Sequence, residues 1–235
     1  MAPIPQPRMP MSPWRLSGVD YGALLNHAPE LAALGEAAHA APYKSPPQAP
    51  VLQLRPCNTL AADGARVEVP ADGVVVGANL GLVIGRSACR VAAADALAHV
   101  AGYLVVADLC SPMANPAGQH YRPAVRQRAR DGFCVLGPEV VPAAALPSPD
   151  LLAVQVLVDG HFAQTLTQTT DTAQRLRGVA QLLADVSDFM TLQSGDVLLL
   201  GASAGAPVAR AGQAVEVRIA GMAGLRFELV AEPAR

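Results

Sequence analysis

Residues 74–85 read VVVGANLGLVIG, and the interpretation of the whole chain starts from this stretch. A short apolar run of this kind is typical of a buried strand. Side chains alternate between the two faces of a strand, so positions 77 and 79 share one face. That face carries Gly77 and Asn79, which interrupt an otherwise apolar strand. The sequence therefore predicts a buried strand in which one face has lost its large side chains.

Most of the other apolar segments also read as strands. Two of them flank Asp159-Gly160, a pair favoured in two-residue hairpin turns. The clearest helix is expected from about Asp171, which matches a capping box with Gln174 and precedes apolar residues at helical spacing as far as Val186. Further strands are expected at 51–54, 103–107, 152–158, 162–167, 197–200, 215–219 and 225–230, and shorter helices at 30–41 and 92–101. This balance favours an α+β, mainly β, fold.

The length of 235 residues suits one well-packed domain with a small appendage. Residues 1–15 contain five prolines and little else, so we expect a flexible tail there. We expect an N-terminal segment over 16–50 and the main domain over 51–235.

Composition excludes several classes of function. A net charge of -2 with 15% charged residues gives no general attraction to nucleic acid or to membranes. The longest apolar run is too short to span a bilayer, and no secretory signal is visible. The four cysteines are widely spaced, so we expect them to be reduced. We therefore expect a cytoplasmic protein that binds a small molecule.

Short motifs spread from Tyr43 to Val230 carry a family resemblance. They read YKSPP at 43–47, RPCNT at 55–59, VIG at 83–85, VAGY at 100–103, YRP at 121–123, RDGF at 130–133, DFMTL at 188–192 and GD at 195–196. In this order and spacing they resemble the fumarylacetoacetate hydrolase family. The resemblance implies a mixed β-sandwich roll and chemistry on oxo-acids, namely decarboxylation and a keto–enol or double-bond shift. Within the family the chain is most similar to the first unit of a two-unit isomerase/decarboxylase of aromatic-acid breakdown, which implies a homo-oligomer or a hetero-oligomer with a sister subunit.

The resemblance also implies a metal site that this chain has lost. In the family, two glutamates at the positions of Gly77 and Asn79 and an aspartate at the position of Asp108 bind Mg²⁺ or Mn²⁺. Such a metal takes oxygen ligands and acts as a Lewis acid towards the enolate. Here only Asp108 survives, since Gly77 offers no ligand and Asn79 only a neutral carbonyl oxygen. We expect weak or absent metal binding, and Asp108 alone fits equally well as a strand-end residue that accepts backbone N–H groups.

Two further positions of the family motif have changed from lysine to arginine. They are Arg55 and Arg128, and Lys44 is the only lysine in the chain. An arginine does not lose its proton in a protein, but it holds carboxylates well through paired hydrogen bonds. The resemblance thus predicts Arg55, Asp108 and Arg128 as catalytic residues, with the arginines stabilising charge instead of transferring protons.

A second group of residues is expected to bind the substrate. They are Tyr121, Arg122, Arg126, Thr172 and Ser203. The residues Arg126, Arg128 and Arg130 alternate, so on an extended segment they would line one face. A solvated face or a subunit interface is the alternative to substrate binding there. Thr172 fits equally well in a first helical turn, and Ser203 lies in a loop that departs from the family pattern. His27 and Glu30 resemble remnants of an acid–base pair, although their spacing does not match it cleanly.

Two hypotheses follow. The chain is either an enzyme subunit that acts on oxo-dicarboxylic or oxo-tricarboxylic acids without a tightly held metal, or a catalytically silent partner of a metal-bearing sister subunit. They differ in whether Arg128→Ala slows the assembled complex.

Overall fold

The computed structural model describes residues 16–41, 43–112, 124–146, 148–167, 175–202 and 205–233. The expected tail at 1–15 lies outside these ranges. So do the capping box at 171–174 and four expected substrate-binding residues, Tyr121, Arg122, Thr172 and Ser203.

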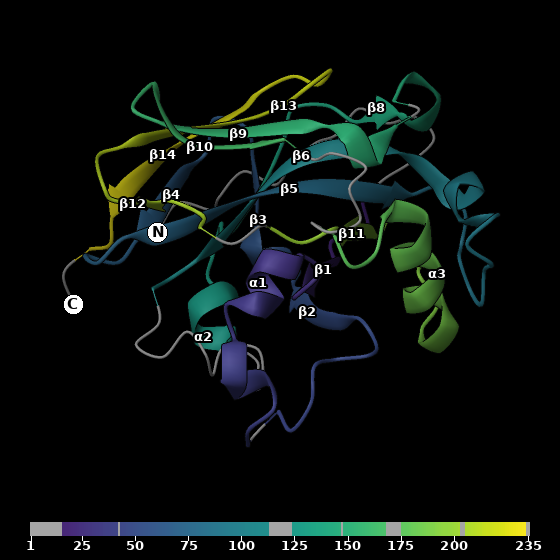
Figure 1. Ribbon diagram of the computed structural model, residues 1–235. Helices are drawn as coiled ribbons and strands as arrows, with labels where there is room; N and C mark the ends of the chain where they lie inside the picture. Colours follow the sequence, from purple (N-terminus) through teal and green to yellow (C-terminus); the bar gives the residue numbers. More distant parts are fainter. Residues whose placement is uncertain are drawn as a thin grey trace.

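Two β-sheets form the described part of the chain and stack face to face (Figure 1). Among the described residues the larger sheet has nine strands, in the order β2-β1-β11-β5-β6-β7-β3, with β12 beside β5 and β8 beside β6. The second sheet has five, in the order β10-β9-β13-β14-β4. The strands of the larger sheet are β1 (Asp20–Leu24), β2 (Val51–Arg55), β3 (Leu60–Ala62), β5 (Val74–Ile84), β6 (Val100–Cys110), β7 (Cys134–Leu136), β8 (Val141–Pro142), β11 (Val197–Leu199) and β12 (Val208–Ala209). Those of the second are β4 (Arg66–Val69), β9 (Ala153–Val158), β10 (His161–Thr167), β13 (Ala214–Ile219) and β14 (Leu225–Ala231). The expected mainly β fold is confirmed.

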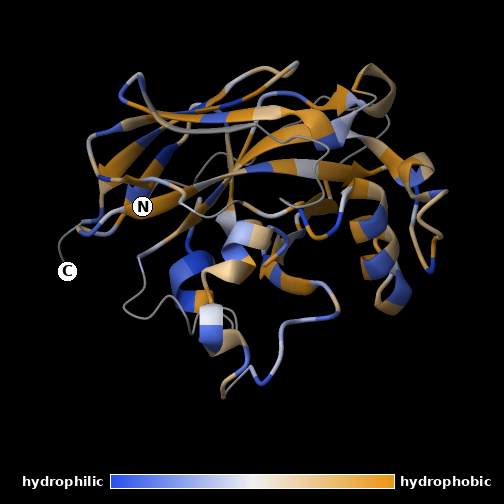
Figure 2. Cartoon of the chain, viewed as in Figure 1, coloured by the Kyte–Doolittle hydropathy of each residue, from blue (hydrophilic) through white to orange (hydrophobic). Residues whose placement is uncertain are grey.

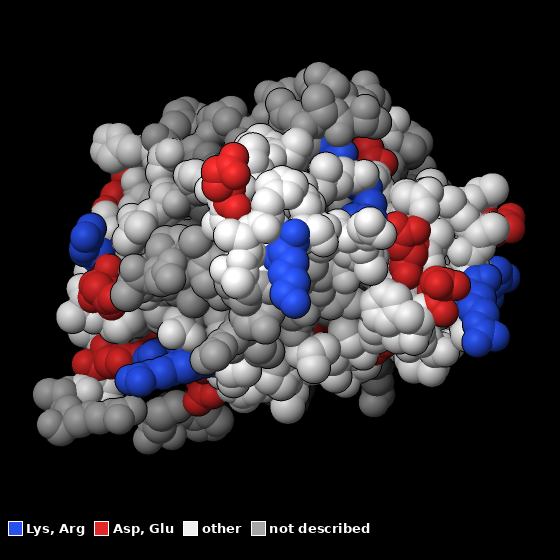
Figure 3. All heavy atoms as spheres, turned by 60° about the horizontal axis from the view of Figure 1, so that its bottom comes forward, with Lys and Arg blue, Asp and Glu red and all other residues white. Residues whose placement is uncertain are grey.

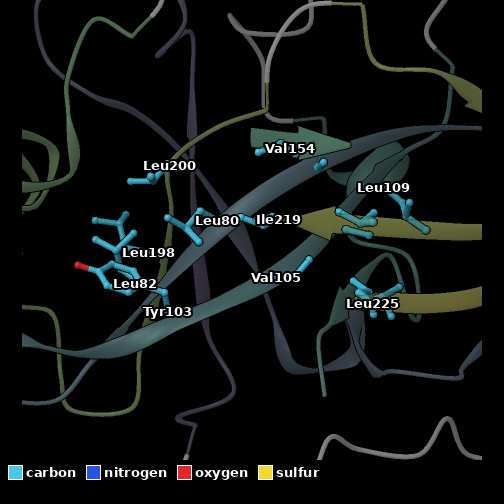
Figure 4. Packing of buried hydrophobic residues seen from close by; sticks show 14 of the residues in the cluster. Leu80, Leu82, Tyr103, Val105, Leu109, Val154, Leu198, Leu200, Ile219 and Leu225 are labelled. Atoms are coloured by element: carbon cyan, nitrogen blue, oxygen red, sulfur yellow. The ribbon is translucent and has the colours of Figure 1, made fainter. Parts of the chain in front are cut away.

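The antiparallel pair β5 and β6 is the centre of the molecule. The expected strand at 74–85 is confirmed as Val74–Ile84, and it pairs along its length with β6. Leu80 on β5 and Val105 on β6 belong to the same buried cluster as Val154 and Ile219 of the five-stranded sheet, whereas Leu82 lies beside Tyr103 and Leu198 (Figure 4). Hydrophobic residues accordingly dominate the facing strands (Figure 2). The opposite face of β5, which carries position 77, therefore points away from this core.

The helices are short and lie mainly on that opposite side. In Figure 1, α1 (Ala28–Ala32) and α2 (Val125–Arg128) lie below the larger sheet, away from the second sheet, and α3 (Val179–Phe189) packs at one end. The 3-10 helices are η1 (Gly35–Ala38), η2 (Cys57–Thr59), η3 (Ala96–His99), η5 (Ala143–Ala145) and η6 (Pro149–Leu151). No helix in the described ranges has the length and apolar character needed to cross a membrane.

The structure corrects the expected start of the main helix. The helix α3 begins at Val179, eight residues after Asp171, with Gly178 as its N-cap. The residues just before it are not helical: Arg175 forms an isolated bridge with His27, and Leu176 donates its backbone N–H to the carbonyl of Asn26 at 2.9 Å. The Val179 N–H is then capped from outside the helix by the carboxylate of Asp150 at 3.1 Å. The hydrogen bond with Asn26 therefore outweighs the helical spacing of the apolar residues before Val179.

Two other helix predictions were too long. The segment at 92–101 forms only η3, since β6 already begins at Val100. The segment at 30–41 is divided between α1 and η1, and Gly35 has a positive φ of 49° that an α-helix does not accept. The hairpin prediction is confirmed, because Asp159 and Gly160 both have positive φ, at 52° and 77°, between β9 and β10.

Candidate functional site

The pairing of β5 with β6 brings the three positions of the family's metal motif together. Gly77 lies directly opposite Asp108, and Asn79 lies opposite Val106, two residues earlier on the same face of β6. The strand β2 brings Arg55 and Gln53 to this place, and α2 brings Arg128. The site is therefore assembled from two central strands, an edge strand and a short helix.

Both carboxylate oxygens of Asp108 already have partners. Oδ1 forms an ion pair with the guanidinium of Arg55. Oδ2 accepts a hydrogen bond from Gln53 Nε2 at 3.0 Å and lies 3.6 Å from Nη1 of Arg128. Only 5% of the Asp108 side chain is exposed, so these contacts replace solvent almost completely. Asp108 is held as an ion-pair partner of arginines.

Arg55 is completely buried. Besides Asp108, its guanidinium donates to the backbone carbonyls of Leu109, at 2.8 Å, and of Arg128. Burial lowers the pKa of Arg55 to about 10, so the group remains charged at neutral pH. Arg55 thus reaches the centre of the site from inside the protein, while Arg128 keeps 16% of its side chain exposed.

The two remaining motif positions are closed. A Cβ at position 77 would lie 2.8 Å from Cβ of Ala202 and 3.0 Å from the carbonyl oxygen of Asp108, so a larger residue does not fit without movement. Asn79 is buried, and its Oδ1 accepts the backbone N–H of Gly201 at 3.0 Å. Neither position offers a ligand towards Asp108.

A divalent metal does not fit this arrangement. A Mg²⁺ or Mn²⁺ ion needs several oxygen ligands that are free to converge on it. Among the described residues no three His, Cys, Asp or Glu side chains cluster in a way that would hold a metal. Asp108 is committed to arginine, and Asn79 to a backbone amide.

The segment around α1 forms one wall of the site. His27 Nε2 lies 3.2 Å from the carbonyl oxygen of Gly201, the same residue whose N–H binds Asn79. Burial raises the pKa of Glu30 to about 7, although a backbone N–H of Leu25 and the charge of Arg128 act in the opposite direction. Glu30 can therefore exchange a proton near neutral pH beside the partly exposed Arg128.

The arginines at 126–130 do not line one extended face, because Arg126 and Arg128 lie on the helix α2. Arg128 turns to Asp108, whereas Arg130 pairs with Glu232 and stacks over Phe133 at 5.4 Å from the ring centre. Arg126 is exposed. The prediction of one shared face was wrong, since it assumed an extended backbone.

Sequence reasoning missed two residues of the site. Asp20 on β1 is completely buried, pairs in register with Arg55, and accepts a hydrogen bond from Cys134 Sγ at 3.4 Å. Burial raises its pKa to about 7, against the lowering effects of Cys134 and Arg55. The other is Gln53, which binds Asp108. The sequence signal for Asp20 was an aspartate at the start of an apolar strand. Gln53 gives no comparable signal, because an isolated glutamine does not indicate a site.

The surface outside the site carries charges of both signs. On the face turned forward in Figure 3, acidic and basic side chains are scattered among uncharged ones. With a net charge of -2, this face lacks the basic surface that nucleic-acid binding requires.

Comparison with known proteins decides the family. The family described as fumarylacetoacetate (FAA) hydrolase C-terminal matches residues 20–230, nearly the whole chain. The chain belongs to this family. It is also 35% identical over 187 residues to the 4-hydroxyphenylacetate degradation bifunctional isomerase/decarboxylase of Escherichia coli, a match that covers 79% of the chain and 41% of that protein. The chain thus spans less than half the length of this relative.

Solved structures of the family share the fold. A 5-carboxymethyl-2-hydroxymuconate delta-isomerase from Mycobacterium smegmatis has a TM-score of 0.75 and 25% identity, and the match covers 94% of this chain and 81% of that one. A fumarylpyruvate hydrolase from Pseudomonas aeruginosa in complex with Mn²⁺ and pyruvate has a TM-score of 0.77 at 22% identity, covering 99% and 97%. The β-sandwich roll expected for the fumarylacetoacetate hydrolase family is therefore confirmed.

Proposed function

We propose that this chain is the metal-free half of an isomerase/decarboxylase for oxo-acids in 4-hydroxyphenylacetate breakdown. The two reactions would be decarboxylation of 5-oxopent-3-ene-1,2,5-tricarboxylate and isomerisation of 2-hydroxyhepta-2,4-diene-1,7-dioate. The similarity to a bifunctional isomerase/decarboxylase of about twice the length supports a paired assembly. We place this assembly in the cytoplasm, as a homo-oligomer or with a metal-bearing sister subunit.

The observation that carries this proposal is the ion pair between Arg55 and Asp108 at the position of the metal motif. It leaves the site with a net positive charge when Arg128 is counted and Glu30 is protonated. The partly exposed guanidinium of Arg128 can bind a carboxylate of the substrate through paired hydrogen bonds. The buried Arg55 would then stabilise negative charge on an enolate by its field, without contacting it. Glu30 would hold or release a proton beside the enolate.

Replacing Arg128 with alanine in the assembled complex tests this role. We expect kcat/KM to fall at least roughly tenfold, because a charged hydrogen-bond donor to the substrate is lost. The measurement is the initial rate of both reactions with the chain and its co-expressed sister subunit. Arg66→Ala is the matched control, since Arg66 is 72% exposed on β4 and pairs only loosely with Glu228. A complex that keeps its full rate with Arg128→Ala would remove the catalytic role of this site.

The same geometry favours a second candidate function. Arg55 and Asp108 are buried and paired with each other, as a structural ion pair would be. On this reading the chain is a catalytically silent partner that stabilises a metal-bearing sister subunit. Arg128→Ala would then leave the rate unchanged, while omission of the chain would lower the melting temperature or the activity of the sister subunit.

A further inference from the structure

The two Nη nitrogens of Arg55 donate to oxygen atoms, whereas its buried Nε has no hydrogen-bond partner among the described residues. The guanidinium donates to Oδ1 of Asp108, to the carbonyl oxygen of Leu109 at 2.8 Å and to the carbonyl oxygen of Arg128. These oxygens come from β6 and from α2, whereas Arg55 comes from the edge strand β2. Carboxylate and carbonyl oxygens are also the groups that bind hard divalent cations. The surroundings of this side chain therefore have the chemistry of a cation site.

We propose that the guanidinium of Arg55 is the resident cation of this site and compensates the charge of Asp108, the role that a divalent metal has in the family. It neutralises Asp108, the one carboxylate that remains of the metal motif. A buried carboxylate without a compensating charge is strongly destabilising, so without a metal Asp108 needs another cation beside it. The family has a lysine at position 55, and the arginine of this chain contacts Asp108 directly through its guanidinium. Arg55 supplies that charge from within the chain.

The rest of the site is closed around this cation. Position 77 has no room for a side chain because Ala202 lies against it, and the oxygen of Asn79 is bound to the Gly201 amide. These features remove competing ligands on the side of Asp108 that faces β5. The guanidinium of Arg55 also connects β2 with β6 and with α2 through hydrogen bonds. Both contacts are to residues more than 50 positions away from Arg55 in the sequence. The Arg55 guanidinium thus holds β2, β6 and α2 together without any need for a bound metal.

Metal rescue of a variant lacking this cation tests the proposal. Arg55→Ala should lower the melting temperature by roughly 10 °C, because it leaves Asp108 buried without its main partner. Millimolar Mn²⁺ should then restore roughly 5 °C in this variant, by binding to the vacated oxygen atoms, and should leave the natural chain unchanged. The measurement is thermal unfolding of the full chain with Mn²⁺ or with EDTA.

Arg175→Ala is the matched control. Arg175 is likewise a buried arginine paired with an aspartate, but that aspartate, Asp150 at 2.7 Å, lies in η6 and not at a motif position. This variant should lose stability without responding to Mn²⁺. Equal stabilisation of the natural chain and Arg55→Ala by Mn²⁺, or equal responses of Arg55→Ala and Arg175→Ala, would overturn the proposal. So would an Arg55→Ala chain that folds and shows no response.

A second set of variants keeps the test decisive if Arg55→Ala does not fold. Arg55→Met combined with Asp108→Asn removes both charges, and should recover at least half of the melting temperature that Arg55→Met alone loses. A double variant as unstable as the single one would show that Arg55 acts through its carbonyl contacts and not as a counter-charge to Asp108. These readouts concern stability alone, so their failure is distinguishable from failure of the proposed enzymatic role.

Discussion

Gly77→Glu, which puts back one glutamate of the metal motif, is expected to destabilise the chain strongly instead of building a metal site. Its Cβ would lie 2.8 Å from Cβ of Ala202 and 3.0 Å from the backbone oxygen of Asp108. Overpacking of this kind costs about 1–3 kcal/mol, and a second buried carboxylate beside Asp108 adds several more. We expect a loss of at least about 4 kcal/mol in the free energy of unfolding, measured by urea denaturation.

Two comparisons make this result interpretable. Val75→Glu, two residues earlier on the same face of β5, is a half-buried position and should cost no more than about 2 kcal/mol. Adding Ala202→Gly to Gly77→Glu should recover about 1 kcal/mol by removing the methyl group in the way. A Gly77→Glu chain as stable as the natural one, and with bound metal, would show that the site is not closed at this position.

Asp20→Asn is expected to change how stability depends on pH. The pKa of Asp20 is raised in the folded chain from 3.8 to about 7, mainly by burial. The folded state therefore holds a proton that the unfolded state releases. The stability that this proton provides is complete below pH 3.8 and is lost as the pH rises towards 7 and beyond. The natural chain should lose up to about 4 kcal/mol from this group between pH 4 and pH 8.

The asparagine variant should lose that part of the pH dependence and be more stable than the natural chain at pH 8. Its side chain still accepts a hydrogen bond from Cys134 but carries no ionisable group. The measurement is the free energy of unfolding from urea titrations at pH 5, 6, 7 and 8. Asp159→Asn is the control, because Asp159 is an exposed turn residue whose pKa is lowered by the backbone N–H of Ala214. Identical slopes for Asp20→Asn and the natural chain between pH 5 and 8 would contradict the assignment.

Much of the fold could be predicted from local patterns in the sequence. The strand at 74–85 is apolar except at Gly77 and Asn79, and the pair Asp159-Gly160 favours positive φ, so both elements are specified by nearby residues. The start of α3 could not be predicted, since the backbone N–H groups of Leu176 and Arg177 are bound by Asn26, about 150 residues away. The short strands β3, β7 and β8 were missed for a similar reason: two or three residues carry too little periodicity.

The site was predictable where residue identity alone decides it. Gly77 has no side chain that could bind a metal, so the loss of that carboxylate was visible in the sequence. The partners of Asp108 were not, because the register of β2 against β1 and the turn of α2 determine that Arg55, Arg128 and Gln53 meet there. The role of Arg55 in catalysis stays a prediction. Its complete burial limits that role to an action through its charge.

Metal analysis of the purified chain tests the central claim most directly. The chain should be expressed alone, dialysed against Mg²⁺ and Mn²⁺, freed of unbound ions and measured by elemental mass spectrometry. The ion pair of Arg55 with Asp108 predicts well below one metal ion per chain, whereas a sister subunit with both glutamates, treated in the same way, should hold about one. One equivalent of Mg²⁺ or Mn²⁺ in this chain, lost on replacement of Asp108 with asparagine, would contradict the account.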